Sequence, residues 1–324
     1  MNRKQSIQKS LLTMMGLLII MMAGYVWAEE GIPEGYLLIE GDILLPVDAA
    51  YDATYGATYW PNGVVPYEFH ANVNATNQQR AIDAMAEWSA IANLTFVLRT
   101  TQTNRIRFMD HPDRNYSEIG MVGGSQDIAI VSWTTQIIIA HEIAHALGFW
   151  HEQSRPDREE YVIINWDRIE EDFKHNFNIR PLAFVYGPYD FDSAMHYGQC
   201  SFSTCVSCSA DLDACRTITA KPDYAGSQSM MGQRTHLSYL DQVSMQMVYS
   251  GTDWIFIDGT YAGWPINLEF GTFEMPYDTF GEGISAVTNG GTLIVQPDTY
   301  ELTDNYLFSR NMLIRAPLGD TLFK

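Results

Sequence analysis

The chain is 324 residues long, and 46% of these residues are hydrophobic and 13% aromatic, which is enough for one or two packed domains and argues against disorder. Its 39 acidic and 19 basic residues give a formal net charge of −20 at pH 7. Nucleic-acid binding requires clustered lysines and arginines, so this balance argues against a nucleic-acid partner. It suits a soluble protein that stays away from anionic membranes.

The N-terminal segment has the pattern of a signal peptide. Three basic residues stand within the first nine positions, an apolar run follows at 11–23, and the residues at 26–28 suit cleavage after Ala28. The alternative is a transmembrane anchor, for which the run is short and after which no comparable segment follows. We therefore predict a signal peptide at 1–28 and a secreted protein with no integral membrane association after its removal.

Residues 29–59 are acidic and rich in alanine, tyrosine and glycine, which is more typical of an extended segment than of a domain core. We interpret residues 29–50 as propeptide-like and residues 51–250 as a globular domain. In that domain a cap at Thr76 predicts a helix through Trp88, and a second helix over about 135–147 should end at Gly148. Strands are expected at 64–69, 94–99, 106–109 and 127–132.

The second expected helix carries residues with zinc-ligand spacing. His141 and His145 are four positions apart and project from one helix face, while Gly148 permits a left-handed turn that can return His151 as a third ligand. Three imidazoles leave zinc an open position for water, and Glu142 next to them can take a proton from that water. The bare His-Glu-x-x-His pattern occurs by chance in many helices, but the added glycine and third histidine complete the metzincin signature.

A second element of the site is expected downstream, at 193–197. Met195 suits an apolar floor beneath a three-histidine zinc, and Tyr197 could reach the metal as a displaceable ligand. Read alone, this stretch would be an ordinary turn with a buried methionine. Because it follows the zinc helix, we interpret it as part of the metal site.

The four cysteines lie within sixteen residues, at Cys200, Cys205, Cys208 and Cys215. In an oxidising compartment this spacing favours two disulfides, whose pairing the sequence leaves open. The alternative is a four-thiolate zinc site seeded by the Cys-x-x-Cys at 205–208.

Residues 251–324 are glycine-rich, with short β-prone runs at 254–257, 292–295 and 311–316. This piece resembles the first turns of parallel β-helix proteins, some of which are carbohydrate lyases. Roughly three or more repeats are needed to bury a solenoid core, so we predict a small β-rich extension and not a working lyase.

Together the motifs resemble the astacin family, which includes the meprins and the tolloid-type proteases. The zinc motif continues to Arg158 as it does in the family, and the segments at 60–67, 193–198 and 232–238 also agree. The similarity covers roughly residues 38–250. It implies an α+β metzincin fold with a twisted, mostly parallel sheet, two long helices and an irregular C-terminal subdomain.

The resemblance implies a secreted zinc-dependent endopeptidase that acts on protein or peptide substrates, and we expect a monomer. One Zn²⁺ would be bound by His141, His145 and His151. Glu142 would be the general base and then the proton donor to the leaving amine, and Tyr197 would stabilise the oxyanion.

Three more roles follow from the same resemblance. Glu152 would anchor the new N-terminus of the mature enzyme, and Asp42 would occupy the zinc of an inactive zymogen. Arg234 would line the pocket after the scissile bond and favour Asp or Glu there. The alternative for Arg234 is a surface ion pair with Asp241.

Two features depart from the family pattern. Family catalytic domains usually carry two disulfides, one of which bridges early and late segments, but no cysteine precedes Cys200 here, so fold stability must come from core packing. Ile39 stands where the propeptide motif usually has an aromatic residue.

Two other functions fit parts of the chain. A catalytically silent, protein-binding homologue would keep the fold, although such a protein need not keep Glu142 and all three histidines. A carbohydrate-interacting protein would act through residues 251–324, which lack a long solenoid.

Overall fold

The computed structural model of the protein describes residues 32–33, 35–47, 58–181, 183, 187–208, 212–251, 253–261, 269, 271–272, 275–300, 310–318 and 321–324. The predicted signal peptide at 1–28 lies outside these residues. Within the described part of the chain, no helix has both the length and the apolar character needed to cross a bilayer.

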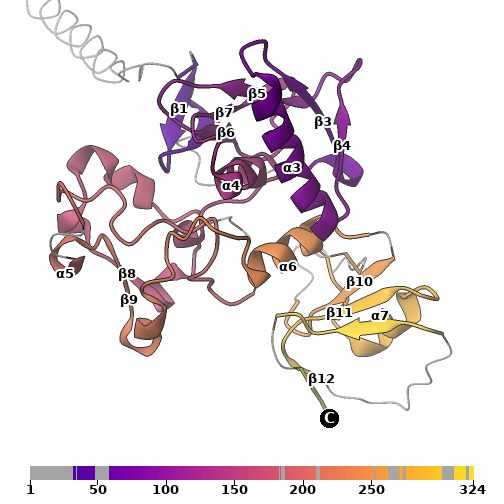
Figure 1. The fold of residues 1–324 in the computed structure, drawn as a ribbon. Coiled ribbons are helices and arrows are strands. Elements are labelled where there is room, and N and C mark those ends of the chain that lie inside the picture. Colours follow the sequence, from indigo (N-terminus) through magenta and orange to yellow (C-terminus); the bar gives the residue numbers. More distant parts are fainter. Residues whose placement is uncertain are drawn as a thin grey trace, which may run out of the picture.

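A seven-stranded sheet lies at the top of Figure 1, with the strand order β1-β2-β6-β7-β5-β3-β4. Strands β7, β5, β3 and the edge strand β4 run parallel to one another, and β6 runs antiparallel to β7. This is the mostly parallel sheet that the family resemblance implies. In the order of the sheet, the strands are Tyr36–Ile39, Ile43–Pro46, Tyr116–Glu118, Ser125–Ile130, Arg105–Asp110, Val64–Phe69 and Thr95–Leu98.

Two long helices, α3 (Ala75–Ile91) and α4 (Gln136–Ala146), share one hydrophobic core with the strands. The indole Nε1 of Trp88 on α3 donates a hydrogen bond to the backbone oxygen of Ala140 on α4 at 2.9 Å, which fixes the two helices against each other. The predicted cap at Thr76 is wrong. Asn74 caps the helix instead, and its Oδ1 accepts a hydrogen bond from the N–H of Asn77 at 3.0 Å.

The segment before the globular domain forms part of the sheet. Strands β1 and β2 make an antiparallel hairpin, which we call the leader hairpin, and β2 pairs in parallel with β6. The side chains of Ile43, Leu44 and Leu45 are fully buried. The expectation of an extended segment is therefore correct, but the expectation that it stays out of the core is wrong, because the free edge of β6 takes it up.

The described residues between 152 and 238 form an irregular subdomain, as expected. Strands β8 (Val162–Ile164) and β9 (Ile218–Ala220) pair antiparallel, and an aromatic core that includes Phe177 and Tyr197 holds the loops together. The short helical turns of the chain are Pro61–Gly63, Glu152–Ser154, Arg158–Glu160, Trp166–Arg168, Glu171–Phe177, Leu212–Cys215 and Pro222–Ser227.

The C-terminal extension stacks short parallel strands at the lower right of Figure 1. Strand β11 (Thr292–Val295) pairs in parallel with β10 (Trp254–Ile257) and with β13 (Leu313–Arg315). A second parallel pair joins β12 (Thr299–Tyr300) to β14 (Leu322–Phe323), and helix α7 spans Phe280–Ala286.

The extension packs on helix α6 (Tyr239–Val248), which no periodic signal had indicated in the sequence. Val243 and Met247 of this helix share a buried cluster with Phe256 and Ile294 of the extension. Helix α6 thus packs against the extension through apolar side chains, while its N-terminus carries polar groups.

The N-terminus of α6 holds the turn at 193–195. Asp241 and Ser238 form a capping box, and the carboxylate of Asp241 also accepts hydrogen bonds from the Oγ of Ser193 at 2.6 Å and from the N–H of Ala194 at 2.9 Å. Burial raises the pKa of Asp241 to about 6 against the effect of these hydrogen bonds. Asp241 is therefore a structural acceptor and not a surface partner of Arg234.

Replacing Asp241 by alanine should lower the free energy of unfolding by about 2 kcal/mol or more, because several hydrogen bonds to one charged acceptor are lost together. Urea unfolding followed by tryptophan fluorescence measures the change. The matched control is Asp213→Ala, since that aspartate side chain is 86% exposed and its loss should stay within about 0.5 kcal/mol. Equal effects of the two substitutions would contradict the role given to Asp241.

Candidate active site

Helix α4 ends in a turn that sends the chain back toward its own last residues. Gly148 has a φ of 104°, and its N–H donates to the oxygen of His145 at 2.8 Å, while the N–H of Phe149 donates to the oxygen of Ala144 at 3.0 Å. This pair of hydrogen bonds is a Schellman motif, whose left-handed position favours glycine. The turn brings His151 up to the two histidines of the helix.

The two helix histidines are each oriented through Nδ1. The Nδ1 of His141 donates to the backbone oxygen of Ala194 at 2.8 Å, and the Nδ1 of His145 donates to that of Phe149 at 2.7 Å. A carbonyl can only accept, so each ring keeps a lone pair on Nε2. These two Nε2 atoms lie 3.1 Å apart and can bind a single ion.

His151 and the leader complete the cluster. The Nε2 of His151 lies 3.2 Å from the Oδ1 of Asp42, and the carboxylate of Asp42 is 3.3 Å from His141 and 3.7 Å from His145. A tetrahedral zinc with ligands at about 2.0–2.1 Å holds those ligand atoms roughly 3.3 Å apart. The spacing of these four side chains therefore fits one shared ion. Within the described residues, the Nε2 of His151 and the Oδ1 of Asp42 have no hydrogen-bond partner, which leaves both free to act as ligands.

Glu142 lies on α4 next to the first histidine, and its side chain is almost fully buried. Burial raises its pKa well above the ordinary value, the nearby carboxylate of Asp42 raises it further, and the charge of Arg234 lowers it. Its Oε2 has no hydrogen-bond partner in the part of the chain that the structure describes. A carboxylate in this state can exchange a proton with a molecule bound beside the metal.

The turn at 193–197 lies against the histidines, since the backbone oxygen of Ala194 accepts from His141. Met195 is buried, and its backbone oxygen accepts a hydrogen bond from the N–H of Glu152 at 3.1 Å. The ring of Tyr197 lies 4.8 Å from the ring of His151, and its hydroxyl donates to the backbone oxygen of Glu40. The tyrosine hydroxyl is thus beside the metal cluster but engaged with the leader.

Arg234 faces the cluster from the late segment of the domain. Its Nη1 donates to the backbone oxygen of His196 at 3.1 Å and to that of Gln233 at 2.8 Å. Among the described residues, no carboxylate lies within ion-pair distance of this guanidinium. Its charge favours ionised Asp42 and Glu142, so it is an anion-stabilising group at the site.

Glu152 lines a cavity whose other lining residues include His151, Trp88 and Asp190. The Oε1 of Glu152 accepts from Arg155 Nη1 and from the N–H of Asp190, both at 2.8 Å. Burial raises its pKa to about 7. The segment expected to enter this cavity after cleavage, residues 48–57, lies outside the described residues.

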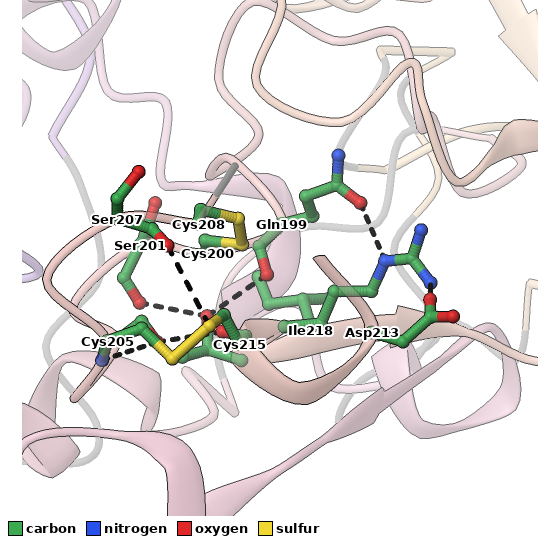
Figure 2. Close-up of a disulfide and its surroundings, with 12 residues drawn as sticks. Gln199, Cys200, Ser201, Cys205, Ser207, Cys208, Asp213, Cys215 and Ile218 are labelled. Carbon is green, nitrogen blue, oxygen red and sulfur yellow. Dashed lines mark hydrogen bonds and ion pairs between the residues drawn. A yellow bond between two sulfur atoms is a disulfide. The ribbon is translucent and has the colours of Figure 1, made fainter. Parts of the chain in front are cut away.

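The four cysteines form two disulfides within one loop that follows the turn at 193–197 (Figure 2). They pair as Cys200–Cys208 and Cys205–Cys215. This confirms the predicted disulfides and excludes the four-thiolate zinc site. The loop presents the ring of Phe202 to the leader, so closely that a Cβ at Gly41 would lie 2.7 Å from Phe202 Cζ.

The sequence did not indicate the roles of three residues at the site, although Asp241 was considered as a partner of Arg234. Glu40 is fully buried against His151, Arg180 binds Glu40, and Asp241 holds the turn at 193–195. The position of Glu40 next to Gly41-Asp42 is the one cue that could have drawn attention to it.

Comparisons with known proteins agree with this geometry. The model of the Astacin peptidase family matches residues 52–250. Bone morphogenetic protein 1 of Xenopus laevis is 36% identical over 197 residues, which cover 59% of this chain and 27% of that protein. The low choriolytic enzyme of Oryzias latipes is 31% identical over 222 residues, covering 65% and 78%.

Among solved structures, high choriolytic enzyme 1 of Oryzias latipes, a hatching enzyme zinc-protease, matches with a TM-score of 0.53 and 31% identity. The match covers 61% of this chain and 96% of that one. The chain spans only about a quarter of the length of bone morphogenetic protein 1. With its family match over most of its length, its sheet and its three converging histidines, the chain belongs to the astacin family of peptidases.

Proposed function

We propose that the chain is a secreted, zinc-dependent endopeptidase that stays inactive until its leader is cut. The observation that carries the proposal is the convergence of three oriented imidazoles beside the free carboxylate of Glu142. His141, His145 and His151 would hold the ion. When bound, zinc supplies Lewis-acid activation of a water molecule and of the scissile carbonyl.

The residues around the ion would transfer the proton and stabilise the oxyanion. Glu142 takes a proton from the attacking water and gives it to the leaving amine, and its buried carboxylate beside the histidines is placed for that exchange. Tyr197 donates a hydrogen bond to the oxyanion once the leader has released its hydroxyl. Met195 forms the floor beneath the histidines.

The leader would impose latency through Asp42, whose carboxylate lies 3.2–3.7 Å from the three histidines and would take the ligand position of the attacking water. The leader hairpin is held there by its pairing with β6 and by buried Ile43 and Leu45. Cleavage within about residues 47–57 would release it. The new N-terminus would then enter the cavity beside Glu152, whose carboxylate is suited to an ammonium group.

Export through residues 1–28 fits the two disulfides, because exported proteins are where disulfides persist. The substrates would be proteins or peptides, and the monomeric state stays a prediction. Arg234 would favour an acidic substrate residue directly after the scissile bond, since a guanidinium can bind a carboxylate through two parallel hydrogen bonds.

The variant Glu142→Ala should bind zinc and fold but lose roughly 10²–10⁴-fold in turnover, because general-base assistance is removed. Casein hydrolysis by the cleaved proteins, with and without a chelator, together with zinc analysis, measures this. Glu171→Ala is the control, since the side chain of that glutamate is 84% exposed and lies on a surface turn. Near-normal proteolysis by Glu142→Ala would refute the assignment, and a His145→Ala variant should instead lose the metal.

The full-length chain should be inactive, and Asp42→Ala should give measurable hydrolysis without cleavage because it vacates the ligand position. Activity assays on uncut protein, with N-terminal sequencing to verify that no cleavage has occurred, test this expectation. An uncut wild-type chain that is already fully active would remove the latency role of Asp42.

Peptide-library profiling should show enrichment of Asp or Glu directly after the cut by about ten- to a hundredfold, the range expected for hydrogen bonds to a charged group. Arg234→Ala should lose this preference. The matched control is Arg168→Ala, because that arginine donates to the backbone oxygens of Asp213 and Arg216 in the irregular subdomain. A flat wild-type preference at this position would show that Arg234 does not select the substrate.

A further inference from the structure

A second carboxylate of the leader fills a closed pocket beside the metal cluster. Glu40 is 0% exposed, and its Oε2 accepts from the Oγ of Ser154 at 2.8 Å and lies 2.9 Å from the Nδ1 of His151. Its Oε1 accepts from the Nε of Arg180 at 2.5 Å. All three partners belong to the catalytic domain, so they remain when the leader is removed.

The pocket is held together without Glu40. The N–H of Arg180 donates to the backbone oxygen of Ser154 at 2.7 Å, and the N–H of Ser154 donates to that of His151 at 3.0 Å. The guanidinium of Arg180 lies 4.9 Å from the centre of the Trp150 ring, a cation–π contact that keeps it in place. The three donors therefore stay oriented toward one point.

An empty pocket of this kind is unfavourable. The side chain of Arg180 is only 15% exposed, and His151 would lose the acceptor that orients it. Partly buried charges and donors without partners are costly, and the geometry of two oxygens matches these donors closely. A carboxylate is thus the group that best replaces Glu40.

We propose that in the cleaved enzyme this pocket binds an acidic side chain of the peptide substrate, which takes the place of Glu40 against Ser154, Arg180 and His151. The proposal rests on the peptidase function and names a feature of its substrates. Glu40 is bonded to Ser154, Arg180 and His151, whereas the side chain of Arg234 donates to backbone oxygens of the domain, so the two arginines serve different positions. The bound carboxylate would also restore the acceptor for Nδ1 of the third histidine.

The first test is library profiling of the enzyme produced by cleavage of the full chain. We expect an acidic preference at a second position, distinct from the one lost in Arg234→Ala. For a peptide with Glu there, Arg180→Ala should lower kcat/KM about ten- to a hundredfold, mainly through KM, while the Gln version of the peptide changes little. Arg180→Lys should recover part of the loss, and Arg168→Ala should behave like the wild type.

The second test measures binding without turnover. Calorimetry on the cleaved Glu142→Ala protein compares a synthetic peptide of residues 36–46 with the same peptide carrying Glu40→Gln. The Glu peptide should bind at least about tenfold more tightly, and Arg180→Ala should abolish the difference.

The outcomes separate the two proposals. If the wild-type enzyme cuts peptides but shows no second acidic preference and the two peptides bind equally, the pocket is refuted and the peptidase function stands. If nothing is cut but the Glu peptide binds more tightly through Arg180, the function fails and the pocket stands.

Discussion

Metal-binding imidazoles are oriented by hydrogen bonds from their other ring nitrogen, and in this molecule three separate segments supply those bonds. The turn at 193–195 holds His141, the turn that ends the zinc helix holds His145, and the leader holds His151. The first two supports are backbone oxygens, which stay in place as long as the fold does. The third is a side chain of a segment that the proposed activation removes.

The residues that hold the turn at 193–195 belong to elements far from the histidines in the sequence. Asp241 holds that turn from the N-terminus of α6, and the opposite face of α6 is buried against the C-terminal extension through Met247 and Phe256. On the other side of the site, the leader enters through the sheet edge and places Glu40 and Asp42 in two different positions at the metal cluster. The zinc helix and the turn at 193–195 therefore hold the histidines from one side, and the leader covers them from the other.

The spacing of the zinc motif allowed its ligands and the returning turn at Gly148 to be predicted, because helix periodicity and a glycine turn are local properties. The main strands were predicted within about two residues for the same reason. The leader hairpin was not, since it is held by pairing with β6, about 70 residues away in the sequence, and no local pattern reports such a contact. Glu40 and Asp241 act across 111 and 48 residues of chain, and no local pattern reports such contacts.

The most direct test of a three-histidine zinc site closed by a leader carboxylate is X-ray absorption at the zinc edge on the uncut full-length chain. We expect four nitrogen and oxygen ligands at about 2.0–2.1 Å, with the outer-shell scattering of three imidazoles. The Asp42→Ala chain should keep the three imidazoles and replace the carboxylate by water. A sulfur shell at about 2.3 Å, or fewer than three imidazoles, would contradict the account.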